Sequence, residues 1–265
     1  MVSIIISFYE RLENLRCCLD SLRLCSEDFD EVVITDDGSG EETVCKLKKM
    51  LLNYDFPINH VWQPKEGFRV AAARNNGIRH AHGDYLIFFD CDFAVFPDTV
   101  KYHLKFAKQK RFVAGWCKYL TEKQTHTVFH SAISEELLEN LYCQIPDKEI
   151  ITAHRRYIKR TILMKLRLAN FKKQSLGGHF SIHRKDIEYI NGYDENFVGW
   201  GGEDEDLGQR LVKAGIYCRS AIRYARALHL WHPKELGDKH WKEGSNVQYF
   251  NRKNVPFYCE NGLKK

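Results

Sequence analysis

The first 115 residues alternate short runs of β-branched and aromatic residues with longer segments of helical periodicity. Predicted strands cover residues 2–8, 31–35, 58–63 and 85–89. Predicted helices between and after them cover residues 10–25, 41–52, 70–80 and 97–108. Strands joined by helices of this length form βαβ units with parallel strands. We therefore expect an α/β fold with an open, twisted, mostly parallel sheet and helices on its faces.

Composition excludes several other classes of protein. A chain of 265 residues with 44% hydrophobic and 28% charged residues can bury a substantial core, which excludes a disordered or collagen-like chain. Its nine cysteines are an odd number without a C-x-x-C pair, which favours reduced thiols over a disulfide framework or zinc cluster. The first predicted strand begins at residue 2, and no apolar run approaches the roughly 18 residues of a spanning helix. We expect a cytoplasmic protein, with the cytosolic face of a membrane as the alternative.

Acidic side chains follow two of the predicted strands at their carboxyl ends. Open α/β sheets bind ligands at this edge, so the segments that begin at Ser7, Thr35 and Asp90 are the candidate site. Asp90 and Asp92 are separated by one residue and repel each other unless a cation lies beside them. Hard divalent ions such as Mg²⁺ and Mn²⁺ prefer such oxygen ligands and also bind diphosphates. A D-x-D alone is a weak signal, because short acidic pairs are common in loops.

The segment from Trp200 to Asp206 combines glycines with consecutive acids at the start of a predicted helix over 204–214. Acids at a helix start are favoured by the helix dipole, which is the ordinary structural interpretation. A carboxylate at Asp204 can also take a proton from an attacking hydroxyl, which an amide cannot do. Trp200 offers a flat apolar face to a sugar ring, or it packs in the core.

Two histidines, His229 and His232, follow an apolar run and lie three positions apart. An imidazole beside a carboxylate pair makes a site that suits Mn²⁺ better than Mg²⁺. We expect a metal site made by Asp90, Asp92 and one of these histidines, and His229 is preferred over His232.

Four segments together resemble the nucleotide-sugar half of a family 2 glycosyltransferase with a GT-A fold: V-S-I-I-I-S-F-Y, D-D-G-S, A-R-N-N-G and D-C-D. The resemblance covers roughly residues 2–100. A second resemblance covers about residues 176–232, where N-G-Y-D-E and W-G-G-E-D are similar to the C-terminal signature of β-1,4-galactosyltransferases and chondroitin-polymerase-like enzymes. The chain departs from the family at Ser7, where proline is common; the substitution removes no functional side chain.

The resemblance implies a metal-dependent, inverting transfer of a hexose or N-acetylhexosamine from a UDP-sugar to a hydroxyl of a glycan or glycolipid, as in surface-polysaccharide or lipo-oligosaccharide synthesis. It implies that Asp204 is the base, that Glu203 orients hydroxyl groups, and that Asp36 or Asp37 holds the nucleoside base. The full set of residues expected to bind the donor is Ser7, Tyr9, Glu10, Asp36, Asp37, Arg74, Asp90, Cys91, Asp92, Gly178, Trp200 and Gly202.

Positive charge is concentrated in residues 148–173, which carry nine Lys or Arg side chains against the single acid Glu149. Such a segment binds an anionic membrane surface, steers an acidic or lipid-linked acceptor, or is simply a solvated helix face. No known nucleic-acid-binding motif appears in it, so we expect no nucleic-acid partner.

We expect one globular unit with three parts: a nucleotide-sugar half (1–115), a basic helical insertion (116–174), and an acceptor half with the tail (175–265). Two other functions remain open from the residues. A non-catalytic nucleotide- or glycan-binding homologue would show a gap in the set of site residues. A sugar nucleotidyltransferase would need a glycine-rich phosphate loop near the N-terminus, where this chain has S-F-Y-E.

Overall fold

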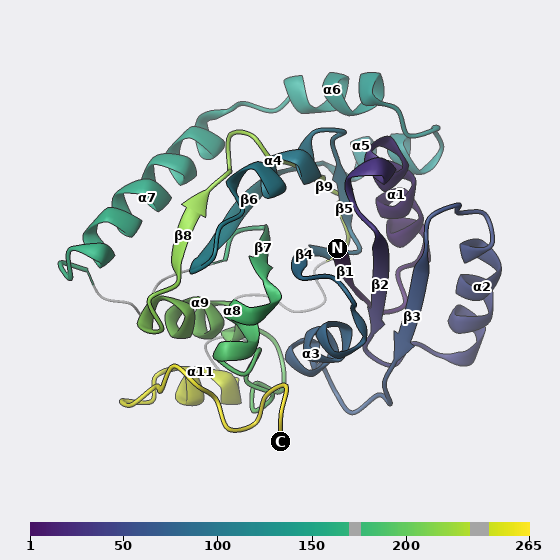
Figure 1. Cartoon of the computed structure of the whole chain (residues 1–265). Coiled ribbons are helices and arrows are strands. Elements are labelled where there is room, and N and C mark those ends of the chain that lie inside the picture. The colour runs from purple at the N-terminus through teal and green to yellow at the C-terminus, as the bar shows by residue number, and fades with distance from the viewer. Residues whose placement is uncertain (170–175, 234–243) are drawn as a thin grey trace.

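The computed structural model describes residues 1–169, 176–233 and 244–265 (Figure 1). Within these ranges, nine strands form one sheet, in which eight follow the order β3-β2-β1-β4-β7-β6-β9-β5 and β8 pairs with β6. The strands are β1 (Val2–Phe8), β2 (Glu31–Asp36), β3 (Ile58–Trp62), β4 (Tyr85–Asp90), β5 (Phe93–Val95), β6 (Arg111–Tyr119), β7 (His179–His183), β8 (Tyr217–Ser220) and β9 (Arg226–His229). The α-helices are α1 (Leu12–Leu22), α2 (Glu41–Leu51), α3 (Val70–His80), α4 (Thr99–Phe106), α5 (Glu122–Phe129), α6 (Glu135–Cys143), α7 (Lys148–Lys165), α8 (Arg184–Tyr189), α9 (Glu203–Lys213) and α11 (Ser245–Phe250), and a 3₁₀ segment covers Arg23–Asp28.

The first four strands form the expected parallel half of the sheet. β1 is central and pairs in parallel with β2 and β4, and β3 pairs in parallel with β2. The register places Ser7 opposite both Thr35 and Asp90. The three strands therefore end at the same level, and the segments that follow them emerge at one edge of the sheet.

The second half of the sheet mixes strand directions. β7 lies between β4 and β6 and is antiparallel to both. β6 also pairs in parallel with β8 and β9, and β9 pairs antiparallel with β5. The strands after β4 are not among the expected ones, because each is paired with a segment far away in the sequence. The expected boundary at residues 115 and 116 falls inside β6, so the sheet runs continuously across it.

Both faces of the sheet are covered because the buried strands alternate their side chains between two cores. Ile4 and Ile6 of β1 pack with Leu15 and Leu19 of α1 on one face. Ile5 faces the other core, which contains apolar side chains of α3, α7 and α9. Parallel strands that are buried on both faces have nearly continuous runs of apolar residues, and β1, β2 and β4 show this pattern.

The expected helical insertion over 116–174 contains, after α5, the two helices α6 and α7, with Pro146 in the connection between them. A proline lacks the N–H that a helix interior requires, which accounts for the break. In Figure 1 these helices form an arc along the outside of the molecule. α7 ends at Lys165, and the last part of the expected insertion, 170–174, lies outside the described residues.

Candidate active site

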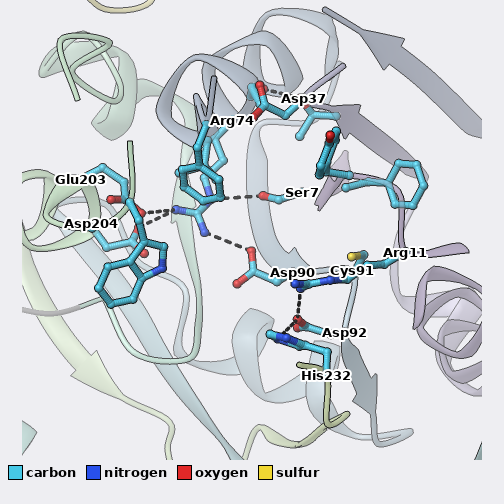
Figure 2. A pocket seen from close by; sticks show the side chains of 18 of the residues that line it. Ser7, Arg11, Asp37, Arg74, Asp90, Cys91, Asp92, Glu203, Asp204 and His232 are labelled. Atoms are coloured by element: carbon cyan, nitrogen blue, oxygen red, sulfur yellow. Dashed lines mark hydrogen bonds and ion pairs between the residues drawn. The ribbon is translucent and has the colours of Figure 1, made fainter. Parts of the chain in front are cut away.

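A cavity of about 1540 Å³ opens at the edge of the sheet where β1, β2 and β4 end. Side chains from the segments around the ends of β1, β2 and β4 and from the start of α9 line it together, and the end of β9 closes another side. Figure 2 shows these groups around one space, with Asp37 and Ser7 on one side, Glu203 and Asp204 on another, and Asp92 with His232 below. The fold therefore brings the acidic groups near positions 91 and 204 to the same cavity.

The loop after β2 is fixed by Asp36 so that Asp37 borders the cavity. Asp36 is fully buried, accepts a hydrogen bond from the Ser39 backbone N–H at 2.8 Å, and lies 2.9 Å from His60 Nε2. Asp37 accepts hydrogen bonds from Gln63 Nε2 at 2.7 Å and from the Arg69 backbone N–H at 2.9 Å. These contacts give Asp36 a structural role and leave Asp37 as the carboxylate of this pair that borders the cavity.

Lys65 and Tyr9 lie on the same side of the cavity as Asp37. The Lys65 ammonium lies 3.5 Å from the centroid of the Tyr9 ring and 3.5 Å from Asp37 Oδ2. Gly38 adopts φ +90°, and a Cβ there would come within 2.6 Å of the Lys65 backbone nitrogen. A glycine at this position thus lets the two loops meet closely enough to form this side of the cavity.

Arg74, on α3, connects the two halves of the cavity. Its side chain donates to Ser7 Oγ at 3.2 Å, to Asp90 Oδ1 at 3.0 Å and to Asp204 Oδ1 at 2.8 Å (Figure 2). A planar guanidinium with several fixed donors is suited to hold three partners at once. The ends of β1 and β4 and the first turn of α9 are therefore tied together through one side chain.

Asp92, His229 and His232 form a cluster whose candidate ligand atoms all lie within 4.8 Å of one another. His232 Nε2 lies 3.2 Å from Asp92 Oδ2, and His229 Nε2 lies 3.6 Å from Asp92 Oδ1. The pairing of β5 with β9 sets Phe93 opposite His229, which brings the histidine to the D-x-D turn. Burial opposes ionisation of Asp92, but the hydrogen bond from His232 and the nearby charges outweigh it and lower its pKa.

The same cluster fits a divalent cation. Asp92 Oδ1 is buried and has no hydrogen-bond partner among the described residues, so its lone pairs remain available to bind a cation. A carboxylate with two imidazoles is a donor set that Mn²⁺ accepts. Asp92, His229 and His232 could therefore hold the ion, and this donor set is independent of Asp90.

The acids at the start of α9 occupy the opposite side of the cavity. Gly202 precedes the helix with φ +93°, a left-handed conformation that glycine adopts without strain. Burial, together with the charge of Asp204, raises the pKa of Glu203 to about 8. Glu203 Oε2 is buried without a hydrogen-bond partner in the described part of the chain. A protonated Glu203 beside an anionic Asp204 gives the site one hydrogen-bond donor and one proton acceptor at neighbouring positions.

The sequence model of glycosyl transferase family 2 matches residues 3–186, which is more than half of the chain. The protein is a family 2 glycosyltransferase. A second model, described as the N-terminal domain of galactosyltransferase, matches residues 160–233, so this glycosyltransferase has a galactosyltransferase-like region. The family membership sets aside the sugar nucleotidyltransferase.

Individual relatives agree with this assignment. The glycosyltransferase is 31% identical over 272 residues to a chondroitin synthase of Escherichia coli; the match covers 97% of this chain and 39% of the relative. A structure described as GalNAc-T7 with UDP, GalNAc and Mn²⁺ has a TM-score of 0.62 at 16% identity, with 88% of this chain and 44% of that one covered. A mannosyltransferase from Pyrobaculum calidifontis, in complex with GDP-Man and Mn²⁺, has a TM-score of 0.61 at 14% identity, with 96% and 65% covered. These likenesses confirm the GT-A fold, and the chain spans well under half the length of the chondroitin synthase.

Most residues expected from the sequence border the cavity of this glycosyltransferase. They are Ser7, Tyr9, Asp37, Arg74, Asp90, Cys91, Asp92, Trp200, Gly202, Glu203, Asp204, His229 and His232. Glu10 instead accepts hydrogen bonds from the Gly40 N–H and the Thr43 hydroxyl at the start of α2, and Asp36 is buried as described above. Gly178 borders a small cavity of about 10 Å³, which shares Gly177, Arg74, Asp90 and Asp204 with the large one.

The two acids of the D-x-D turn have different surroundings in the glycosyltransferase. Asp92 joins the two histidines, whereas Asp90 pairs with Arg74 and lies outside that cluster. Residues i and i+2 of a turn that leaves a strand need not point the same way, and here Arg74 pairs with Asp90 while the histidines face Asp92. The expectation that Asp90 is also a metal ligand stays a prediction.

Sequence reasoning missed several residues of this site. Arg11 lies 3.6 Å from Asp92, and Lys65, Tyr119 and Trp231 also border the cavity. Lys65 follows the end of β3, so the rule that pointed to the other strand ends could have found it. Tyr119 lies at the end of β6, a strand outside the expected set, and no local signal marked it.

Proposed function

We propose that this glycosyltransferase moves a hexose or N-acetylhexosamine from a UDP-sugar to a hydroxyl of a glycan or glycolipid acceptor, with inversion and with a divalent metal. The observation that carries the proposal is the shared cavity: the cluster of Asp92, His229 and His232 and the carboxylate of Asp204 border the same space. A set of site residues without a gap favours this function over a non-catalytic homologue.

The donor is proposed to lie along the ends of β1, β2 and β4. Asp37 offers a carboxylate to the N–H groups of a base, and Tyr9 offers an aromatic face beside it. Both features would also accept guanine, and the named structural neighbours carry GDP-Man in one case and UDP in the other. The choice of uridine over guanosine is therefore the part of the proposal that a binding experiment tests.

Asp92, His229 and His232 would hold Mn²⁺, or Mg²⁺ as the alternative, and the ion would offset the negative charge on the departing nucleoside diphosphate. Asp90 is held by Arg74 and contributes to the same wall, where it can meet the ribose or sugar hydroxyls. Arg74 itself borders the donor region and connects it to the acceptor side.

Asp204 is proposed as the general base. It is 32% exposed to the cavity at the start of α9, where an acceptor hydroxyl can approach it from outside. Its carboxylate would take the proton of that hydroxyl while the oxygen attacks the anomeric carbon opposite the departing diphosphate. Glu203, with its raised pKa, would donate a hydrogen bond to an acceptor or donor oxygen, and Trp200 would pack against a sugar ring.

Substitution of Asp204 by Asn tests the base directly. We expect D204N to lose transfer activity almost completely while its affinities for UDP and Mn²⁺ stay near those of the wild type. The matched control is D84N, because Asp84 is a surface carboxylate with 86% exposure outside the cavity. Retained transfer by D204N, or loss of UDP binding along with activity, contradicts the assigned role.

A thermal-shift panel tests the donor. At about 100 times its dissociation constant a ligand adds roughly 2.7 kcal/mol of apparent stability, which raises Tm by several degrees for a chain of this size. We expect the shift with UDP or a UDP-sugar plus Mn²⁺ and a smaller one with GDP. No shift with any uridine nucleotide removes the UDP part of the proposal, and an equal shift without Mn²⁺ removes the metal part.

Contact of residues 148–173 with an anionic membrane is a further part of the proposed function, because glycolipid acceptors lie at such surfaces. α7 exposes Ile158 (41%) and Ile162 (52%), and Leu166 (61%) follows one turn later. Arg155, Lys159 and Lys165, all exposed, flank these apolar side chains. Among the described helices, α7 and the others are all too short or too polar to cross a bilayer. The exposed apolar and basic side chains of α7 favour a helix that lies along a membrane surface. A cytoplasmic location of the protein remains a prediction.

A further inference from the structure

Tyr193 is a fully buried tyrosine whose hydroxyl reaches the proposed base. It donates a hydrogen bond to Asp204 Oδ1 at 3.2 Å, and Arg74 Nη1 donates to the same oxygen at 2.8 Å. Among the described residues, no hydrogen bond reaches the other oxygen, Oδ2. The carboxylate is therefore held along one edge by the protein, and its second oxygen is left for a ligand in the cavity.

The backbone of Tyr193 is clamped by Asn75, the neighbour of Arg74 on α3. Asn75 Nδ2 donates to the Tyr193 carbonyl at 2.8 Å, and the Tyr193 N–H donates to Asn75 Oδ1 at 2.9 Å. Gly192 allows this approach, because a Cβ at that position would lie 2.5 Å from Asn75 Oδ1. Two consecutive residues of α3 thus act on Asp204: Arg74 contacts it directly, and Asn75 fixes the residue that supplies the second donor.

Packing alone does not account for the hydroxyl. The Tyr193 ring packs edge-on against Phe88, with the ring centroids 6.4 Å apart, and a phenylalanine would make the same contact. A buried hydroxyl is costly unless it has a hydrogen-bond partner, and here the partner is the Asp204 carboxylate. Burial, reinforced by the charge of Asp204, raises the pKa of Tyr193 well above its usual value, so the hydroxyl stays a donor.

We propose that Tyr193 is a positioning residue that holds the Asp204 carboxylate with Oδ1 against the protein and Oδ2 facing the acceptor hydroxyl. The inference rests on the proposed function of Asp204 as the base. Small displacements of a reacting group lower catalytic rates strongly, so a second donor that fixes the rotation of the carboxylate acts on the chemical step rather than on donor binding.

The kinetic test compares Y193F with the control Y249F. Tyr249 also donates its hydroxyl to a carboxylate, Asp194, at 2.8 Å, but it lies outside the residues that border the cavity. We expect Y193F to lower kcat for transfer by roughly tenfold, with the KM for the donor and the affinity for Mn²⁺·UDP unchanged. Y249F should keep the wild-type kcat. A wild-type kcat in Y193F, or a loss of UDP affinity parallel to a loss of Tm, overturns the positioning role.

A structural test separates this inference from the proposed function. Crystal structures of the wild type and Y193F, both with UDP and Mn²⁺ added, should show Asp204 in one orientation in the wild type and rotated or in two orientations in the variant. An unchanged Asp204 in Y193F overturns the inference whatever the enzyme transfers. A wild-type protein that transfers from no nucleotide sugar would instead remove the proposed function, and the orientation of Asp204 would still decide the role of Tyr193.

Discussion

The guanidinium of Arg74 lies 2.8 Å from the carboxylate of Asp204, although 130 positions separate the two residues in the chain. Arg74 belongs to α3, and Asp204 belongs to the first turn of α9. The same guanidinium also contacts Asp90 at the end of β4. The candidate site is therefore built from segments far apart in the chain, and a single side chain links the end of β4 to the proposed base.

The first prediction concerns this bridge. Lysine keeps the charge of Arg74 but cannot hold three partners in fixed directions. We expect R74K to lower kcat/KM by roughly a hundredfold. The control is R79K on the same helix, because Arg79 pairs with Glu195 away from the cavity. Steady-state kinetics of both variants measure the difference, and equal activity of R74K and the wild type would show that the bridge is not needed.

The second prediction concerns the metal cluster. H232A removes one of three candidate ligands around Asp92, and we expect a loss of Mn²⁺ affinity of at least about tenfold. D92N should have a larger effect, because it removes the anionic ligand. The exposed His126 on α5 provides the control variant H126A. Titration followed by the electron paramagnetic resonance of free Mn²⁺ measures the affinity, and unchanged binding in D92N argues against this metal site.

The third prediction is a pH dependence of stability caused by Glu203. Burial and the charge of Asp204 raise its folded pKa to about 8, above the usual 4.5, so the folded protein binds a proton that the unfolded chain releases. The associated stability is complete below about pH 4.5 and is lost as the pH rises through 8. We expect E203Q to gain about 2 kcal/mol or more over the wild type above pH 8, relative to their difference near pH 4.5.

Urea unfolding of the wild type and E203Q across this pH range measures the effect. The control is E188Q, because Glu188 is a surface residue of α8 with 45% exposure. E203Q and the wild type should diverge as the pH rises. Parallel stability curves would mean that Glu203 is ionised in the folded protein at neutral pH.

The fourth prediction concerns the nine cysteines, all of which are free thiols. Cys45 and Cys143 are exposed, and the other seven are buried. Burial raises the pKa of Cys91, in the D-x-D turn, well above its usual value, and the charges of Asp92 and Asp90 add to the effect. Because the thiolate is the reactive form, a thiol reagent should modify Cys45 and Cys143 first and Cys91 only on unfolding. Peptide mapping after brief labelling checks the order, and early modification of Cys91 would contradict its burial.

The fifth prediction concerns α7. Replacement of Arg155, Lys159 and Lys165 by Gln removes three cations beside the exposed apolar side chains, and each cation contributes about 1 kcal/mol at an anionic surface. We expect binding to vesicles that contain phosphatidylglycerol to fall by roughly a hundredfold. The same replacement of Lys46, Lys48 and Lys49 on α2 is the control. Cosedimentation measures binding, and wild-type binding by the α7 variant would exclude this face as the contact.

Much of the nucleotide half was predictable from the sequence because its signals are local. Apolar runs of strand length, helical periodicity and polar residues at the strand ends were sufficient to predict β1 to β4 and to single out the acids that follow them. The start of α9 was equally local, since G-G followed by acids specifies a turn and a helix start within a few residues. These patterns also carried the family resemblance that the comparisons confirm.

Only the tertiary structure decided which partner each of these side chains meets. Asp36 and Asp37 are neighbours in sequence, yet one is buried against His60 and the other borders the cavity. Asp90 likewise meets Arg74, and Asp92 meets the histidines. Tyr193, whose backbone is held by Asn75, meets Asp204. Each distinction depends on which distant segment packs against a given side chain. Strand pairing and helix packing set these partners over separations such as 16 residues for Arg74 and Asp90 and 118 for Asn75 and Tyr193, and local sequence patterns carry no record of them.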